Sequence, residues 1–226
     1  MGQAYFVTGT DTEVGKTCAA AALLYAWRQR GRTVAAMKPI ASGCRNTAEG
    51  LRNADAEMLL AECSTTHSYG CMNPYAFEPP IAPHIAAAEA GVTIEIDPSV
   101  RQAQQLAEGT DRFVVEGVGG WRVPLGGALT TADLAVALAY PVIVVVGIRL
   151  GCINHALLTL ESIGHRELPI AGWIANEVDP ECARIDDIIE TIGTCCAAPL
   201  LGRIPHLTDS SPARVATHLS LPDSIS

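Results

Sequence analysis

Near the amino terminus, an apolar stretch is followed by a polar loop and then by Gly15-Lys16-Thr17. Lys16 begins an alanine-rich segment with the composition of a helix. Backbone N–H groups in the first turn of a helix bind phosphate, and the helix dipole adds to the attraction. A lysine at this place reaches the β- and γ-phosphates of a nucleotide, and the hydroxyl of the next residue binds Mg²⁺. These residues predict a phosphate-binding loop for a nucleoside triphosphate with Mg²⁺.

The spacing of this loop differs from the common pattern G-x-x-x-x-G-K-[ST]. Thr10 stands at the place of the first glycine, and the glycine lies one residue earlier, at Gly9. The loop also contains Asp11, Thr12 and Glu13, polar residues that a minimal phosphate cradle does not need. The alternative is an ordinary strand–turn–helix with a chance Gly-Lys-Thr. Strand, loop and helix nevertheless occur in the order that a phosphate loop requires.

Two acidic residues are candidates for a metal site. A magnesium site at a phosphate loop usually takes a carboxylate from the end of another strand. Glu116 follows the predicted strand 112–115, and the glycines after it allow a close backbone approach to a nucleotide. Asp55 lies near the start of a predicted helix. Two alternatives stay open, because Glu116 could cap the following turn and Asp55 could merely complement its helix dipole.

Lys38 follows the second apolar stretch and precedes Pro39. The proline forces Lys38 into an extended conformation, so the strand ends there, at the edge of a parallel sheet where ligands bind. Ser42 adds a hydroxyl to the same loop. The alternative is a solvated surface lysine. Placed with Lys16 near one γ-phosphate, Lys38 would neutralise charge on both reactants and favour phosphoryl transfer to an anionic acceptor.

Short apolar runs alternate with helical patterns along the chain. This alternation predicts right-handed crossovers and a doubly wound, mostly parallel sheet flanked by helices, as in phosphate-loop NTPases. The chain of 226 residues suits one domain, residues 1–226. The predicted strands are 5–8, 33–37, 112–115, 142–146, 170–175 and 200–204. The predicted helices are 16–30, 54–62, 99–108, 131–139, 154–164 and 181–194.

Two segments lack a clear pattern. Residues 64–83 contain four prolines and predict an irregular loop over the sheet, with a lid as one interpretation. The residues after Leu207 are polar and weakly patterned, so we expect the last ~20 residues to be loosely ordered.

Composition narrows the classes of partner. The formal net charge is −9, and an acidic surface repels the phosphate backbones of nucleic acids. The longest apolar stretch, 141–147, is much shorter than a membrane span, and the amino terminus lacks the pattern of a signal peptide. The eight cysteines include no C-x-x-C pair, as expected for reduced thiols in the cytoplasm rather than zinc ligands.

The chain resembles dethiobiotin synthetases from Phe6 to about Leu207. The resemblance is specific because its segments recur in order, and the displaced glycine of the phosphate loop is itself a feature of that family. The matching segments are 6–17, Lys38-Pro39 with Ser42-Gly43, 50–53 with Asp55, 73–75, 83–84, 115–117 with 119–121, 150–155, 171–176, and 199–202 with 204–205.

The resemblance implies an ATP-dependent ligase of biotin synthesis that forms carbon–nitrogen bonds. Such an enzyme takes 7,8-diaminononanoate, CO₂ and Mg-ATP. One amine captures CO₂ as a carbamate, the γ-phosphoryl group moves to the carbamate, and the second amine attacks the mixed anhydride. The products are dethiobiotin, ADP and phosphate.

The resemblance also implies roles for the matching residues. Lys38 and Lys16 are the expected catalytic lysines, with Thr17, Asp55 and Glu116 as ligands of Mg²⁺. The expected nucleotide contacts are Glu13, Val14, Gly15, Lys16, Thr17, Cys18, Asp55, Glu116, Gly117, Val118, Gly119, the adenine reader Asn176, Glu177, Pro205, His206 and Leu207. The expected contacts of the diamine or carbamate are Thr12, Ser42, Gly151, Cys152, Ile153 and Asn154.

Members of this family are homodimers with the substrate at the interface. The turn 151–154 of one subunit would then face the site of the other. A helix that starts near Asn154 would offer its positive end to the distal carboxylate of the substrate. Read without the resemblance, Cys152 is a packed thiol.

Other functions share this architecture. An amidotransferase-type ligase of corrinoid synthesis usually carries an added glutaminase domain, for which 226 residues leave no room. A switch ATPase of the partitioning or septum-positioning kind places a signature lysine early in the loop, where this chain has Asp11. A plain nucleotide-binding module leaves Lys38 and Ser42 without a role. The synthetase is therefore the preferred interpretation, and the switch ATPase is the alternative.

Overall fold

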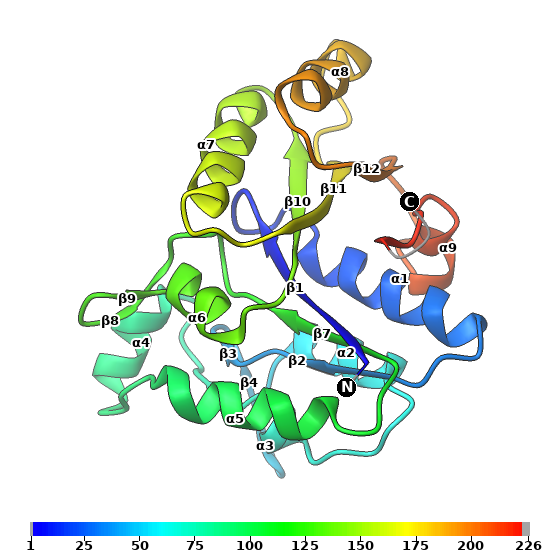
Figure 1. Ribbon diagram of the computed structural model, residues 1–226. Helices are drawn as coiled ribbons and strands as arrows, with labels where there is room; N and C mark the ends of the chain where they lie inside the picture. Colours follow the sequence, from blue (N-terminus) through cyan, green and yellow to red (C-terminus); the bar gives the residue numbers. More distant parts are fainter. Residues whose placement is uncertain (1, 223–226) are drawn as a thin grey trace.

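The computed structural model describes residues 2–222. Its centre is a parallel six-stranded sheet with the strand order β12-β11-β10-β1-β7-β2 (Figure 1). The strands are β1 (Gln3–Gly9), β2 (Val34–Met37), β7 (Arg112–Glu116), β10 (Val142–Ile148), β11 (Ile170–Glu177) and β12 (Leu200–Ile204). Each lies where the sequence predicts a strand, so the predicted α/β fold is confirmed.

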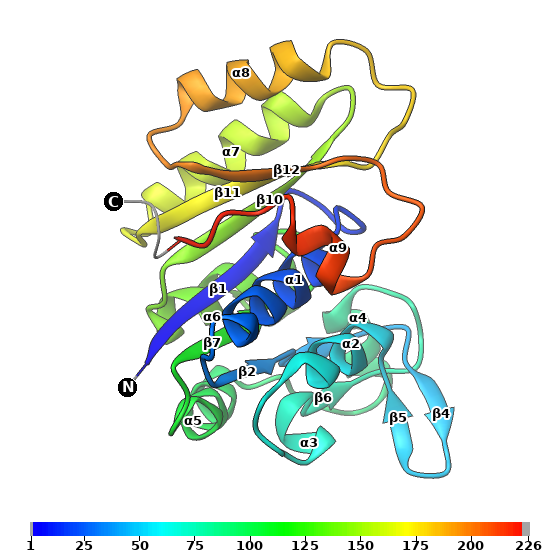
Figure 2. The same ribbon diagram turned by 90° about the vertical axis from the view of Figure 1, so that its right-hand side faces the viewer.

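Helices cover both faces of the sheet (Figures 1 and 2). One face carries α1 (Lys16–Gln29), α2 (Ala54–Glu62) and α9 (Pro212–Ala216). The other carries α5 (Ile96–Ala107), α6 (Thr131–Leu138), α7 (Cys152–Gly164) and α8 (Ile185–Cys195). Side chains of β1 alternate between the two cores, because Tyr5 and Val7 pack against α1 whereas Phe6 packs on the opposite face. Both faces of the strand are buried, which explains its unbroken apolar sequence.

Shorter elements lie at the carboxyl edge of the sheet and in the loops beside it. They form three small two-stranded sheets and two short helices. These elements are β3 (Ile40–Ala41) with β6 (Tyr75–Ala76), β4 (Arg45–Thr47) with β5 (Gly50–Arg52), β8 (Pro124–Gly126) with β9 (Leu129–Thr130), α3 (Tyr69–Met72) and α4 (Pro83–Glu89).

The segment 64–83 is more ordered than its sequence predicts. It contains α3 and β6, and the carbonyl oxygen of Met72 accepts a hydrogen bond from the backbone N–H of Lys38 at 2.9 Å. Tyr75 likewise donates its N–H to the carbonyl oxygen of Pro39 at 3.0 Å. Outside α3 and β6 most of the segment is irregular, as predicted, and these long-range hydrogen bonds hold it against the loop that carries Lys38.

The prediction of a loose carboxyl-terminal end does not hold for residues 212–222. Residues 212–216 form α9, and the side chains of Val215 and Leu221 are buried in the core beside α1. Leu219 forms a β-bridge with Gly202. These two buried side chains anchor the segment to the core beside α1, although its overall composition is polar. Residues 223–226 lie outside the described residues.

Three predicted helices start at other residues in the structure. α7 begins at Cys152 rather than 154, since Gly151 precedes it with a φ of +89°. α8 begins at Ile185 rather than 181, after Arg184 in the left-handed region. α5 begins at Ile96 rather than 99, because a proline is tolerated in the first turn of a helix. Within residues 2–222, no helix combines the length and the apolar character needed to cross a membrane.

Candidate functional site

The loop between β1 and α1 has the geometry of a phosphate cradle. Gly15 precedes α1 with a φ of +86°, so the first N–H groups of the helix point out of its amino end. Lys16 is buried, and its Nζ donates to the carbonyl oxygen of Asp11 at 2.9 Å. The ammonium group is thus folded back across the loop, where a bound polyphosphate would lie.

The loop is anchored on the ends of neighbouring strands. Asn176, in β11, donates from Nδ2 to the carbonyl oxygen of Val14 at 2.9 Å. Thr10 donates its N–H to the carbonyl oxygen of Val145 in β10 at 3.0 Å. A Cβ atom added to Gly15 would lie 2.2 Å from Nδ2 of Asn176, so this position accepts only glycine without a rearrangement. The loop is therefore held in its left-handed turn from both sides.

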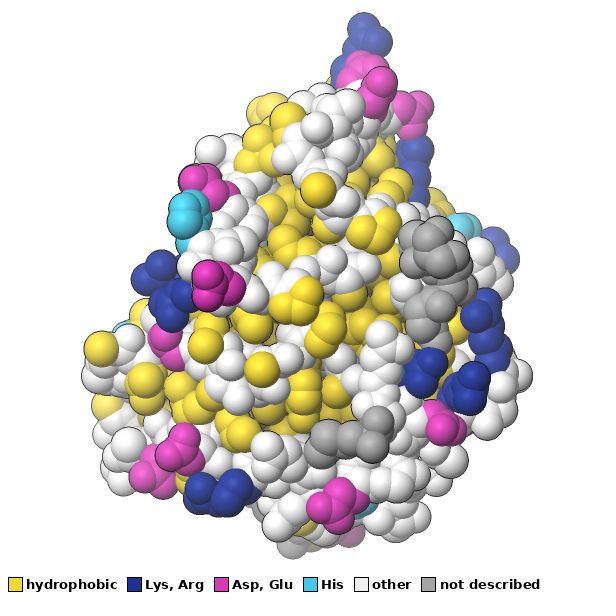
Figure 3. Space-filling model, viewed as in Figure 1, with side chains coloured by type: hydrophobic (Ala, Val, Ile, Leu, Met, Phe, Trp, Pro, Cys, Tyr) yellow, Lys and Arg dark blue, Asp and Glu magenta, His cyan; other side chains and the backbone are white. Residues whose placement is uncertain are grey.

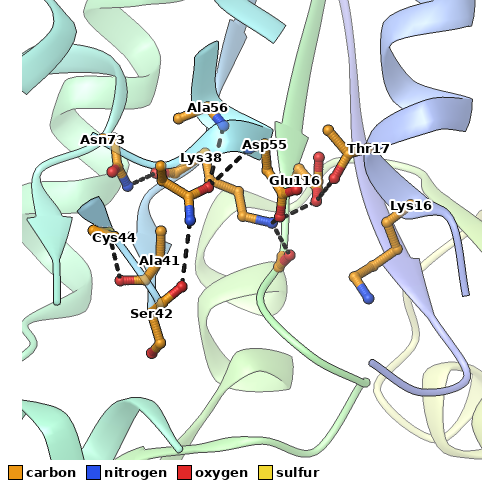
Figure 4. Close-up of polar contacts among 12 residues, drawn as sticks. Lys16, Thr17, Lys38, Ala41, Ser42, Cys44, Asp55, Ala56, Asn73 and Glu116 are labelled. Atoms are coloured by element: carbon orange, nitrogen blue, oxygen red, sulfur yellow. Dashed lines mark hydrogen bonds and ion pairs between the residues drawn. The ribbon is translucent and has the colours of Figure 1, made fainter. Parts of the chain in front are cut away.

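Lys38 lies at the centre of a buried charge cluster (Figure 4). Its Nζ donates to Oε1 of Glu116, to Oδ2 of Asp55 at 3.1 Å and to the carbonyl oxygen of Gly117 at 3.3 Å. Only 3% of the surface of Lys38 and none of that of Glu116 is exposed. The structure thus excludes a solvated surface lysine, and the ammonium instead compensates two carboxylates.

Thr17 joins this cluster from the first turn of α1. Its hydroxyl donates to Oε1 of Glu116 at 2.8 Å, the same oxygen that accepts from Lys38. The structure therefore brings Thr17, Lys38, Asp55 and Glu116 together, and Figure 4 shows Lys16 beside them. These residues come from the carboxyl ends of β2 and β7 and from the amino ends of α1 and α2, as a doubly wound sheet requires.

The pKa values of the two lysines are shifted in opposite directions. Burial, followed by the positive charge of Lys38, lowers the pKa of Lys16 to about 8. Burial also acts to lower the pKa of Lys38, but the charges of Glu116 and Asp55 outweigh it and raise that pKa above its ordinary value. Both ammonium groups are therefore mostly protonated at neutral pH, but Lys16 loses its proton at a lower pH than Lys38.

The same cluster can accept a divalent cation. Oε2 of Glu116 is buried and has no hydrogen-bond partner in the described part of the chain. A buried carboxylate oxygen in this state is costly unless a ligand completes it. Asp55, whose side chain is 48% exposed, faces the same cluster. Residues 2–222 hold no group of three His, Cys, Asp or Glu side chains that could bind a metal, so the cation would also need oxygens from a ligand or water.

A pocket of about 510 Å³ opens beside the phosphate loop. Asp11 and Thr12 line one side of it, and Trp121 and His155 line the other. Arg149, which follows β10, forms an ion pair with the phosphate loop, since its Nη2 lies 2.5 Å from Oδ2 of Asp11. A larger pocket of about 650 Å³ lies at the opposite, amino edge of the sheet, beside the starts of β11 and β12. The smaller pocket is the better ligand site, because ligands of doubly wound sheets bind at the carboxyl edge.

The remaining predicted site residues lie around the carboxyl edge of the sheet and differ in burial and in their hydrogen-bond partners. Cys18 is half-buried, and its Sγ lies 3.5 Å from the carbonyl oxygen of Ser210. Glu177 pairs with Arg203. The hydroxyl of Ser42 is buried without a partner in the described part of the chain. Val14, Val118 and Glu13 contribute backbone to the two loops, and 205–207 follow β12 directly.

The turn 151–154 lies between the carboxyl end of β10 and the start of α7. Cys152 is buried there, as expected for a packed thiol, whereas Gly151 and Asn154 are exposed. Ile153 is half-buried.

Sequence reasoning missed four residues that shape the site. Arg149 follows β10, so the rule that ligands gather at strand ends could have found it. Asn53 stands in a favoured helix-capping position, and Asn73 precedes a proline. No local signal marks Tyr69.

Comparison with known proteins first supports the fold. A family described as "AAA domain" matches residues 3–214. A septum site-determining protein MinD from Pyrococcus horikoshii, complexed with Mg-ADP, superposes with a TM-score of 0.58 over 96% of this chain and 93% of its own, at 15% identity. A ParA family ATPase from Chlorobium tepidum gives 0.57 over 100% and 93%, at 18% identity. At such identities, the likeness concerns the fold alone.

Sequence relatives decide between the two interpretations. ATP-dependent dethiobiotin synthetases from Pseudomonas paraeruginosa and Xanthomonas oryzae are 54% and 48% identical to this chain. The alignments cover 96% and 97% of the chain and 96% and 98% of these relatives. The synthetase of Aromatoleum aromaticum is 51% identical over 97% of the chain and 98% of its own length. The alternative of a switch ATPase therefore rests on a shared fold only, and the chain belongs to the family of ATP-dependent dethiobiotin synthetases, which are ATP-dependent ligases.

Proposed function

We propose that this chain, as one domain over residues 1–226, closes the ureido ring of dethiobiotin from 7,8-diaminononanoate and CO₂ with Mg-ATP. The observation that carries the proposal is the convergence of two lysines and two carboxylates at one edge of the sheet, in a chain about half identical to known synthetases. A cytoplasmic location suits this chemistry, since the eight cysteines are all free thiols.

The triphosphate would bind at the amino end of α1. There the loop N–H groups and the side chain of Lys16 face it, and the ammonium would leave the carbonyl oxygen of Asp11 for a phosphate oxygen. On the base side, the amide of Asn176 is already oriented by its bond to Val14 and would present its oxygen to the adenine amino group. The backbone of 205–207, with Glu177 and Cys18, would border the nucleoside.

Mg²⁺ would be held by Thr17, Asp55 and Glu116. When bound, it would neutralise the negative charge that develops on the transferred phosphoryl group. The free oxygen of Glu116 supports this assignment, because it has no other partner among the described residues. The other oxygen already has its donors in Lys38 and Thr17, which fix the orientation of the carboxylate.

The reaction would proceed in three steps at the pocket edge. One amine attacks CO₂ and loses a proton to become a carbamate. A carbamate oxygen then attacks the γ-phosphorus, and the bond to the ADP oxygen breaks. Finally the second amine attacks the carbonyl carbon and loses a proton, so that the ring closes as the bond from this carbon to the phosphate oxygen breaks and phosphate leaves. Lys38 and Lys16 would stabilise the carbamate and the migrating phosphoryl group electrostatically, and Thr12 and Ser42 would contact the diamine or carbamate.

We further propose a homodimer with the diamine at its interface, contacted by residues 151–154 of the partner. Figure 3 looks at the amino edge of the sheet, where hydrophobic side chains occupy the central part and most charged side chains lie around the rim, whereas residues 151–154 follow β10 at the opposite, carboxyl edge. Leu129, Leu150 and Leu158 are among the large hydrophobic side chains that the described chain exposes. Leu150 directly precedes residues 151–154, and Leu158 lines the pocket beside the phosphate loop, so these exposed apolar side chains suit burial against a second copy at this edge.

The direct test is an assay of purified protein with the diamine, ¹³C-labelled bicarbonate and Mg-ATP, followed by mass spectrometry. We expect one labelled carbon in a ring-closed product, with one ADP formed per ring. Reactions without the diamine should form no labelled product. ATP consumption without label in the product would contradict the proposal.

The lowered pKa of Lys16 predicts that ATP binding takes up a proton at alkaline pH. Free protein loses the Lys16 proton above pH about 8, and the anionic phosphates would restore it on binding. We expect uptake approaching one proton per ATP at pH 9, measured by calorimetry in buffers of different ionisation enthalpy. Affinity should fall as pH rises above about 8. Lys16→Arg serves as the control, since arginine stays charged and should take up none; equal uptake by both proteins would refute the assignment.

A further inference from the structure

A chain of hydrogen bonds runs behind Lys38, on the side away from the phosphate loop. Asn73 is buried, and its Nδ2 donates to the carbonyl oxygen of Lys38 at 2.7 Å. The hydroxyl of Tyr69 donates to Oδ1 of Asn73 at 3.2 Å and accepts from the backbone N–H of Asn53 at 2.7 Å. The tyrosine hydroxyl thus uses both its proton and a lone pair to join two buried asparagines.

The far end of this chain reaches a metal-ligand candidate. Oδ1 of Asn53 caps α2 by accepting from the N–H groups of Asp55 at 3.1 Å and Ala56 at 3.3 Å. Nδ2 of the same asparagine donates to the carbonyl oxygen of Ser42 at 3.3 Å. One network therefore fixes the main chain at three sites, Lys38, Ser42 and Asp55, which all contribute side chains to the proposed reaction.

We propose that Tyr69, with Asn73 and Asn53, positions Lys38 relative to Asp55, so that the Lys38 ammonium and the Asp55 carboxylate keep the separation that catalysis needs. The inference rests on the proposed function for its kinetic readout. None of the three is a catalytic residue, because each acts through the backbone of another. Lys38 and Asp55 are far apart in sequence, on different elements, and a shift of about 1 Å between reacting groups can cost about a hundredfold in rate.

The ring of Tyr69 has a separate structural role that the test must leave intact. The guanidinium carbon of Arg52 lies 4.3 Å from the centre of this ring. Tyr69→Phe keeps that contact and removes only the hydroxyl. A matched control exists in Tyr25, a half-buried tyrosine on α1 whose ring lies 5.7 Å from the guanidinium carbon of Arg28.

The kinetic experiment compares Tyr69→Phe, Tyr25→Phe and the unmodified protein. We expect Tyr69→Phe to lower kcat about tenfold or more while KM for ATP changes less than about threefold, since geometry rather than uniform binding is lost. Tyr25→Phe should leave both constants within about twofold. Equal kcat in both variants would overturn the inference. If Tyr69→Phe folds poorly, Asn73→Asp keeps the side-chain shape and the acceptor for Tyr69 but removes the donor to Lys38, and it should lower kcat similarly.

A binding experiment separates this inference from the proposed function, because it needs no diamine. The Mg²⁺ concentration that half-saturates ATP binding is measured by calorimetry in a double-mutant cycle of Tyr69→Phe with Asp55→Asn. If Tyr69 acts through Asp55, Tyr69→Phe raises this concentration about fivefold in the unmodified protein and less than twofold in Asp55→Asn. Additive effects, or no effect in either background, would show that Tyr69 is merely structural, whether or not dethiobiotin forms.

Discussion

Replacing Lys38 by methionine is expected to lower the rate of dethiobiotin formation by about a thousandfold. Its ammonium is the fixed positive charge nearest the two carboxylates and would face the transferred phosphoryl group. The same change should destabilise the fold by about 3–5 kcal/mol, because it leaves the fully buried Glu116 without its cation. Product formation by mass spectrometry and urea unfolding measure the two effects. A variant that forms dethiobiotin at a near-normal rate would remove Lys38 from the chemistry.

The double variant Lys38→Met with Glu116→Gln separates stability from catalysis. It has no buried unpaired charge, so most of the lost free energy of unfolding should return. Turnover should stay as low as in the single variant, since neither the ammonium nor the carboxylate is restored. Recovery of both stability and turnover would mean that the single variant was inactive only because it unfolded.

The main sheet could be predicted because its strands carry their signal locally. Val142–Ile148 is apolar on both faces, and such a short run between turn residues is typical of a central strand of a parallel sheet. α3 could not be predicted in this way. It is a single turn, and it is held by the bond from the N–H of Lys38 to Met72 and by the hydroxyl of Tyr69. The first of these contacts joins residues 34 positions apart and the second joins residues 16 positions apart, so neither leaves a periodic pattern in the sequence.

The site shows the same division. Lys16, Lys38 and Glu116 could be named because each follows or precedes a recognisable strand or helix end. The arrangement of these three residues relative to one another could not be predicted. The sequence left a solvated Lys38 open as an alternative, whereas the structure buries its ammonium between Glu116 and Asp55. The pairing of carboxylates and amines depends on the packing of β2 against β7 and on the cap of α2. The residues next to Lys38 in the sequence indicate neither of these contacts.

Gly15→Ala is expected to weaken ATP binding on the order of a hundredfold. The left-handed φ of +86° costs alanine about 1–2 kcal/mol. The new methyl group would also lie 2.2 Å from Nδ2 of Asn176 and displace the amide that holds Val14. Loss of that buried bond adds about 1–3 kcal/mol, and about 3 kcal/mol in total corresponds to the stated loss of affinity. Calorimetric titration with Mg-ATP measures it.

Gly31→Ala, just beyond the other end of α1, isolates the backbone strain from the clash. Gly31 has a φ of +75°, and a Cβ atom there would meet nothing within 4 Å. This variant should lose about 1–2 kcal/mol of stability and bind ATP within about twofold of the unmodified protein. If both alanine variants weakened ATP binding equally, general destabilisation would be the cause. If neither did, the turn at Gly15 would not be part of the nucleotide site. A loss confined to Gly15→Ala would tie ATP binding to the turn at Gly15 rather than to general destabilisation, because both substitutions add a methyl group to a glycine with a left-handed φ beside α1.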